Sequence, residues 1–309
     1  MLFYNKRREK NLDFTIGRDD ISVTVYVPWN CCNHCQFCSS KQDYDRIKPN
    51  VNQLMKNLEF VRESIIPIVV FTGGEPSSNL PILERALEVV KNKVVYINTS
   101  LPSWNAEGFI ELVNSTPWVR GVSISRHCTT FEEDSCLLNN IAPDAIIAKF
   151  RKPVRINVVE RCSDSFSHQN LMKYVQRWEK ISQEMLRSTP GILPLTLNLR
   201  GDYNKQDPHT LHELSENSVV NELATSFFYH GHSFCNVCDT CSFTKYEEGK
   251  AILYISYHRG LATTAIKIGP ITEVNDVIVL QDGSLAYDWD GKNQGLGEFM
   301  ELIKSEEEE

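Results

Sequence analysis

At 309 residues, with 41% hydrophobic and 23% charged residues, the chain has an ordinary globular composition and is long enough to bury a large core. Its formal net charge of −8 argues against a protein that wraps a polyanion over its whole surface, although it leaves room for a local basic cleft. The sequence has neither a run of about 18 apolar residues nor an apolar core near its start, so we expect a cytoplasmic protein without a membrane span.

Predicted strands and helices alternate from residue 21 to about residue 205. After a basic leader at 1–20, β-branched and aromatic residues predict a first strand at 21–28, and apolar residues at helical spacing predict a helix at 51–64. The same patterns predict five more strands, at 68–71, 94–97, 119–125, 154–159 and 195–199. Helices are expected between or after them, at 80–91, 106–113, 142–150 and 168–186. Strands that are each followed by a helix imply right-handed crossovers and a parallel sheet, but six units are too few to close an eight-stranded barrel.

The remaining residues, 206–309, predict a C-terminal extension that holds a cysteine-rich segment and a small β appendage. Strands are expected at 252–257 and 264–268, and a hairpin with an Asp-Gly turn is expected at 276–287. The predicted domains are therefore the leader at 1–20, the βα units at 21–205 and the extension at 206–309.

Seven of the ten cysteines fall in two tight groups, which is typical of metal ligation in a reducing compartment. Cys31, Cys35 and Cys38 follow the first predicted strand with C-x3-C-x2-C spacing, so one short loop can fold their thiolates around a single soft metal centre. A structural zinc site normally has four protein ligands, whereas three leave one coordination position open. For this loop alone, a zinc knuckle or buried thiols are the alternatives, and Cys32 offers a second C-x2-C-x2-C register.

A glycine-rich turn ends the second predicted strand, in the run Thr72-Gly73-Gly74-Glu75-Pro76. Two residues without Cβ atoms let the main chain approach a ligand closely and adopt positive φ angles. The turn therefore predicts a place where the backbone meets a bound molecule.

The cysteine loop, with Phe37 directly before its last cysteine, and the Gly-Gly-Glu-Pro turn together resemble the two signatures of radical S-adenosylmethionine (radical SAM) enzymes. Within that family, the molybdenum-cofactor-biosynthesis-like branch is the nearer resemblance. The resemblance to the family implies a partial (β/α)6 TIM-type barrel and a [4Fe-4S] cluster whose open iron binds S-adenosylmethionine. It further implies reductive cleavage of SAM to a 5′-deoxyadenosyl radical, with electrons from a one-electron reductant such as flavodoxin or ferredoxin.

In a parallel barrel the reactive loops gather at the C-terminal ends of the strands. Beside the glycine turn, this rule selects Asn98, Thr99, Ser125, Arg126, His127, Asn157, Glu160, Arg200, Asp202 and Tyr203. On the resemblance, the candidate cofactor-binding residues are Phe37, Gly73, Gly74, Glu75, Ser125, Arg126 and Asn157. The alternatives are that Asn157 satisfies backbone groups and that Arg126 forms a surface ion pair.

A second group, Cys235, Cys238 and Cys241, has C-x2-C-x2-C spacing and predicts an auxiliary iron–sulfur cluster. The alternative is structural zinc, with a fourth ligand drawn from His230, His232, Cys128, Cys136 and Cys162.

The predicted function is a radical SAM enzyme that abstracts hydrogen from a small-molecule or nucleotide-derived substrate. Modification of a peptide or a nucleic acid is the first alternative. An activase that places a glycyl radical on a partner enzyme and a zinc-stabilised binding module without catalytic activity are the others.

Overall fold

The computed structural model describes residues 14–16, 21–29, 31–33, 35, 38, 48–159, 168–200, 218–234, 239–259 and 265–287. It divides the chain into two compact units, one from the segments Met1–Asn30, Ser39–Tyr96 and Thr263–Glu309, the other from Cys31–Cys38 and Ile97–Ala262. The predicted domain boundary near residue 205 lies outside the described residues, so the three predicted domains stay a prediction.

The first unit contains a sheet with the strand order β14-β13-β2-β3-β4. Its parallel strands are β2 (Ser22–Tyr26), β3 (Ile68–Thr72) and β13 (Asp276–Val279), and β14 (Leu285–Ala286) forms a hairpin with β13. Helices α2 (Val51–Glu63) and α3 (Leu80–Val89) link β2 to β3 and β3 to β4 (Val94–Thr99). A separate sheet holds β1 (Phe14–Ile16), β12 (Ile271–Val274) and β11 (Ala265–Ile268).

Both α-helices that the structure describes in this unit begin at an asparagine cap. The side-chain oxygens of Asn50 and Asn79 accept hydrogen bonds from the backbone N–H groups of Gln53 and Ile82. Such caps satisfy donors that the first helical turn leaves without a partner.

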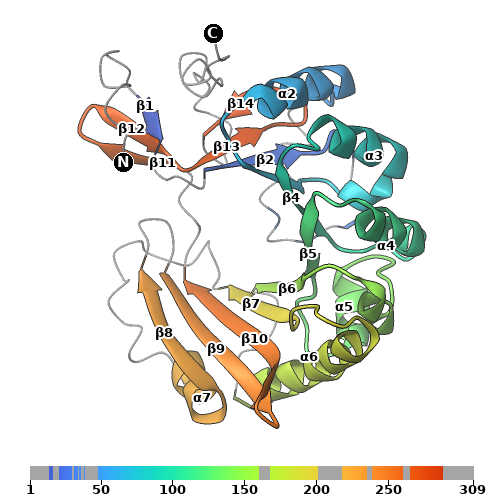
Figure 1. Cartoon of the computed structure of the whole chain (residues 1–309), viewed down its shortest axis with the longest axis vertical. Helices are drawn as coiled ribbons and strands as arrows, with labels where there is room; N and C mark the ends of the chain where they lie inside the picture. Colours follow the sequence, from blue (N-terminus) through green and yellow to red (C-terminus); the bar gives the residue numbers. More distant parts are fainter. Residues whose placement is uncertain are drawn as a thin grey trace. The chain divides into compact units, whose positions relative to one another are not determined.

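The second unit has the strand order β5-β6-β7-β10-β9-β8. Strands β5 (Val119–Ser125), β6 (Val154–Val159), β7 (Thr196–Arg200) and β10 (Lys250–Arg259) are parallel, whereas β9 (Asp239–Glu247) and β8 (Phe228–Phe234) continue the sheet antiparallel. The helices of this unit, drawn in Figure 1, are α4 (Ala106–Ser115), α5 (Phe131–Leu137), α6 (His168–Ser188) and α7 (Ser218–Ser226).

The strands of the second unit, called the second sheet below, form one apolar and one polar face. Buried apolar side chains lie in register across four neighbouring parallel strands at Ile124, Ile156, Leu197 and Ile255. One residue further along each strand, the register line is polar throughout, at Ser125, Asn157, Asn198 and Ser256. Successive side chains of a strand point to opposite faces, so the two lines lie on opposite sides of the sheet.

Helix α6 covers the apolar face. Phe243 of β9 pairs with Ile255, so Lys245, two residues further along β9, points to the same side and forms an ion pair of 2.5 Å with Glu179 of α6. The hydroxyl of Ser182, also in α6, donates to the carbonyl of Ile252 and accepts from the N–H of Leu195.

The α/β class with a sheet rich in parallel strands is confirmed, and two sequence-based expectations need correction. The helix expected at 142–150 is the short 3-10 helix η3 (Asp144–Lys149), which starts directly after Pro143. The strand expected at 252–257 is not part of a separate appendage, because its apolar residues Leu253, Ile255 and Tyr257 extend the buried face of β7. Among the helices that the structure describes, none combines the length and the apolar character needed to cross a bilayer.

Candidate functional site

The turn after β3 can be formed only by glycine at its first position. Gly73 and Gly74 have φ angles of 63° and 48°, in the left-handed region that residues with a Cβ atom rarely adopt. A Cβ atom added to Gly73 would lie 2.6 Å from Cγ of Tyr26. The backbone of the turn therefore packs directly against the aromatic ring at the end of β2.

Glu75 shapes the same turn through its side chain and its carbonyl group. Its carboxylate is 1% exposed, and Oε1 accepts hydrogen bonds from the N–H (3.1 Å) and the hydroxyl (2.8 Å) of Ser77. Its backbone oxygen accepts a hydrogen bond of 2.7 Å from the indole of Trp29. With the bond from the N–H of Val27 to the carbonyl of Thr72, these contacts connect the turn to the segment that leads from β2 to the cysteines.

We expect Gly73→Ala to lower the free energy of unfolding by about 2–5 kcal/mol, the sum of about 1–2 kcal/mol of left-handed backbone strain and about 1–3 kcal/mol of overpacking. Gly191→Ala is the matched control, because Gly191 also has a positive φ of 82° but no atom lies within 4 Å of its added Cβ. Urea denaturation of both variants checks this. Equal losses would show that the Tyr26 ring imposes no constraint on the turn.

The cysteine loop presents thiols that solvent can reach. The side chains of Cys31 and Cys35 are half-buried and that of Cys38 is exposed, and each described cysteine is a thiol, not half of a disulfide. The N–H of Asn33 donates to Sγ of Cys31 at 3.4 Å, and the N–H of Cys38 donates to the carbonyl of Cys35 at 3.2 Å. Phe37 lies outside the described residues.

The side chain of Cys32 points towards Asn139. Its thiol lies 3.8 Å from the carbonyl of Asn139, whose side-chain amide in turn donates to the carbonyl of Cys32 at 3.0 Å. This contact favours the register of Cys31, Cys35 and Cys38 for a shared centre. Within the described part of the chain, no three His, Cys, Asp or Glu side chains are already gathered in an arrangement for a metal ion.

The three thiols nevertheless fit an iron–sulfur cluster by the chemistry of their donor set. They are soft donors on one short loop, they remain accessible, and an N–H donor already points at one sulfur atom.

At the ends of β5 and β6 the structure places Ser125 and Asn157 side by side. The two residues are register partners, both are half-buried, and Oδ1 of Asn157 accepts a hydrogen bond of 2.7 Å from Nδ2 of Asn198 on β7. Asn157 therefore bonds to a neighbouring side chain and not only to backbone groups.

Arg126 has a structural role in the described chain. Its side chain is 0% exposed, and its guanidinium donates to the carbonyls of Ser100 (2.8 Å), Ser125 (2.7 Å) and Ala142 (2.9 Å). It also lies 3.3 Å from Oδ1 of Asp144, so its ion pair is a buried one and not the surface pair considered from the sequence.

Three charged residues that sequence reasoning missed complete this network. Asp134 of α5 is 0% exposed and accepts hydrogen bonds from the N–H groups of His127 (2.6 Å) and Cys128 (2.9 Å). Arg177 of α6 lies 2.8 Å from Asp134 and 2.7 Å from Asp144. The network fixes the loop after β5. Its only sequence signal was an acidic residue at the fourth position of a Thr-capped helix.

His127 is neutral because it is buried beside a cation. Burial, with a smaller effect of the Arg126 charge, lowers the pKa of His127 to about 3. Its Nδ1 accepts a hydrogen bond of 3.3 Å from the N–H of Val159, which a protonated Nδ1 could not do.

The stability conferred by neutral His127 is expected to decline in acid. An unfolded histidine titrates near pH 6.5, so below that pH the unfolded state binds a proton that folded His127 does not accept until about pH 3. Stability should fall by up to about 1.4 kcal/mol per pH unit from this group. His127→Asn removes this contribution, so its stability deficit relative to wild type should shrink between pH 7 and pH 5 in urea denaturation. A deficit that stays constant with pH would contradict the assignment.

Of the second cysteine group, only Cys241 lies within the described residues; Cys235 and Cys238 lie outside them. Cys241 is 1% exposed in β9, and its sulfur is 4.0 Å from the hydroxyl of Tyr229. Nε2 of His230 lies 2.6 Å from the hydroxyl of Thr244. Burial raises the pKa of Cys128 to about 12, which makes it a poor thiolate donor.

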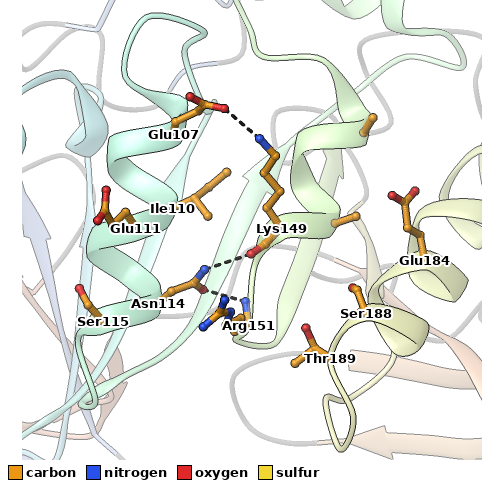
Figure 2. Close-up of a pocket in the computed structure, with 12 residues that line it drawn as sticks. Glu107, Ile110, Glu111, Asn114, Ser115, Lys149, Arg151, Glu184, Ser188 and Thr189 are labelled. Atoms are coloured by element: carbon orange, nitrogen blue, oxygen red, sulfur yellow. Dashed lines mark hydrogen bonds and ion pairs between the residues drawn. The ribbon is translucent and has the colours of Figure 1, made fainter.

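A groove of about 740 Å³ lies elsewhere in the second unit, between α4, η3 and the end of α6 (Figure 2). Lys149 crosses it to reach Glu107 at 2.8 Å, and Asn114 bonds to the backbone of Lys149 and Arg151. None of the predicted site residues lines it. The groove is therefore not the candidate site.

Comparison with known proteins supports the fold class. No family model matches the sequence, and no curated protein matches it. Among solved structures, the fold is similar to that of SuiB from Streptococcus suis. SuiB bound to the precursor peptide SuiA aligns over 92% of this chain and 64% of its own, with 14% identity and a TM-score of 0.58.

SuiB bound to S-adenosylmethionine aligns over 89% of this chain and 62% of its own, with 14% identity and a TM-score of 0.58. SuiB alone aligns with a TM-score of 0.57 over 92% of this chain and 65% of its own. This chain thus spans slightly less than two thirds of the length of SuiB. At this identity the likeness establishes the fold alone.

Proposed function

We propose that this protein is a radical SAM enzyme with the partial (β/α)6 TIM-type barrel of that family. The observation that carries the proposal is the order of two local structures, a three-cysteine loop after β2 and a Gly-Gly-Glu-Pro turn after β3. The similarity of the fold to that of SuiB, which has been crystallised with S-adenosylmethionine, supports it.

In this proposal Cys31, Cys35 and Cys38 hold a [4Fe-4S] cluster, and the backbone of Gly73 and Gly74 approaches SAM. When bound, the cluster and SAM together supply a one-electron reductive cleavage that generates a hydrogen-abstracting radical. Glu75 holds the turn in shape through Ser77, and Arg126 holds the loop after β5. We propose Phe37, Ser125 and Asn157 as further cofactor contacts, and a flavodoxin or ferredoxin as reductant in a cytoplasmic setting.

Two substrate classes follow from different observations. The sequence favours a small-molecule or nucleotide-derived substrate. Modification of a peptide is the second candidate, favoured by the structure of SuiB with a precursor peptide. The Cys235, Cys238 and Cys241 group is proposed to hold an auxiliary iron–sulfur cluster, with zinc as the alternative.

Anaerobic reconstitution with iron and sulfide tests the cofactor assignment. We expect about eight irons per chain, falling to about four when Cys235, Cys238 and Cys241 are all replaced by Ala, as two four-iron clusters require. The electron paramagnetic resonance spectrum of the reduced protein should change when SAM is added, because SAM occupies the open iron. Cys136→Ala, at an exposed cysteine outside both groups, is the control and should keep all irons. A colourless protein that binds only zinc would refute the proposal.

A further inference from the structure

The polar face of the second sheet extends over five strands. The central register line of Ser125, Asn157, Asn198 and Ser256 continues to Ser242 of β9. A neighbouring line holds Arg200, His258 and Thr240 beside one apolar residue, Val159. The line on the other side holds Ser123, Arg155, Thr196, Tyr254 and Thr244. Parallel strands are usually apolar on both faces because both faces are buried, so a polar face across β5, β6, β7 and β10 needs an explanation.

Hydrogen bonds connect these side chains across four strands. Asn198 donates to Asn157 at 2.7 Å, and its Oδ1 lies 3.2 Å from the hydroxyl of Ser256. Ser256 lies 3.2 Å from Nε2 of His258, whose Nδ1 lies 2.9 Å from the hydroxyl of Thr240. Asn198 is 0% exposed and the others are half-buried. Such a chain of partly buried groups fixes side-chain orientations, as a binding site requires.

The described residues of this face include two cationic side chains. Arg155 and Arg200 both act on His258: burial, followed by the charges of Arg200 and then Arg155, lowers its pKa to about 4. The imidazole is therefore neutral at physiological pH. Among the described residues in the three register lines, two are arginines and none is Asp or Glu.

We propose that this face binds an oxyanion, the carboxylate or phosphate group of the substrate, between Arg155, Arg200 and the side chains that are hydrogen-bonded to His258. This inference deepens the proposed function by assigning an anionic substrate. Arginine suits the role because its planar guanidinium has five N–H donors and can bind an oxyanion while it keeps another partner. The hydroxyls of Thr240 and Ser256, with Nε2 or Nδ1 of neutral His258, supply further short-range polar contacts.

The cluster-free protein tests this without any catalytic step. With histidine labelled for nuclear magnetic resonance, the His258 imidazole signals, assigned by their absence in His258→Gln, are followed during titration with inorganic phosphate and, separately, acetate. Sodium chloride keeps the ionic strength constant. We expect a saturable shift with at least one of the two anions, and their relative affinities distinguish a phosphate site from a carboxylate site.

Arg200→Gln and Arg155→Gln should each weaken anion binding at least tenfold, which corresponds to about 1.4 kcal/mol. Arg155 is exposed, so its variant should keep the fold. Arg120→Gln is the matched control at an exposed arginine of β5 and should bind like wild type. A shift that does not saturate, or that persists in both arginine variants, would overturn the proposal.

A competition experiment separates the substrate from SAM, which has a carboxylate of its own. Phosphate or acetate should remain bound when SAM is added at saturating concentration. Displacement of the anion by SAM would show that the oxyanion site between Arg155, Arg200 and His258 belongs to the cofactor and would overturn its assignment to substrate. If the protein failed to bind a cluster at all, the anion titration would still report on the face, so the two proposals can fail separately.

Discussion

An Asp134→Ala variant is expected to have a free energy of unfolding about 3–5 kcal/mol lower than that of wild type, the usual cost of removing one partner of a buried ion pair. The substitution removes one of the two carboxylates that pair with Arg177 and deprives the N–H groups of His127 and Cys128 of their acceptor. Urea denaturation at pH 7 measures the loss.

Glu132→Ala is the control for this variant, because Glu132 is an exposed acidic residue of the same short helix. Its effect should stay within about 0.5 kcal/mol. Burial raises the pKa of Asp134 in spite of the neighbouring Arg177. If both variants lost the same small amount, the network would not be what holds the loop after β5.

The second large effect concerns the cofactor. Cys35→Ala should lose the first cluster and, with it, all reductive cleavage of SAM, because two thiolates cannot replace three as ligands of a four-iron cluster. Iron content and 5′-deoxyadenosine formation, both measured under anaerobic conditions, check this. Cys32→Ala is the matched control: its thiol points towards Asn139, so the variant should keep both properties. Loss of both properties in Cys32→Ala would favour the alternative register of Cys32, Cys35 and Cys38, whereas their retention in Cys35→Ala would contradict both registers.

Local patterns predicted much of the fold. The strands of the βα units and their parallel pairing could be expected because β-branched runs and helical spacings alternate regularly along the chain. Strand β10 was misplaced, because its apolar residues Leu253, Ile255 and Tyr257 indicate a strand but not its neighbour. That neighbour, β7, lies about fifty residues earlier, and sequence separation of that size leaves no local trace.

The candidate site was predictable where it depends on short motifs. The positive φ angles of Gly73 and Gly74 are what the glycine pair indicated. The roles of Arg126 and Asn198 were not readable, because hydrogen bonding to distant carbonyls or to a neighbouring strand depends on tertiary contacts. A usable signal did exist in β7, where Thr196, Asn198 and Arg200 alternate with leucines in what would otherwise be a doubly buried strand.

We propose that the chain cleaves SAM reductively, and the formation of 5′-deoxyadenosine tests this proposal. The reconstituted wild-type protein is reduced with dithionite under anaerobic conditions in the presence of SAM, and 5′-deoxyadenosine is quantified by chromatography and mass spectrometry. We expect 5′-deoxyadenosine to form only when both the reductant and the iron–sulfur cluster are present. A fully iron-loaded protein that leaves SAM intact under these conditions would contradict it.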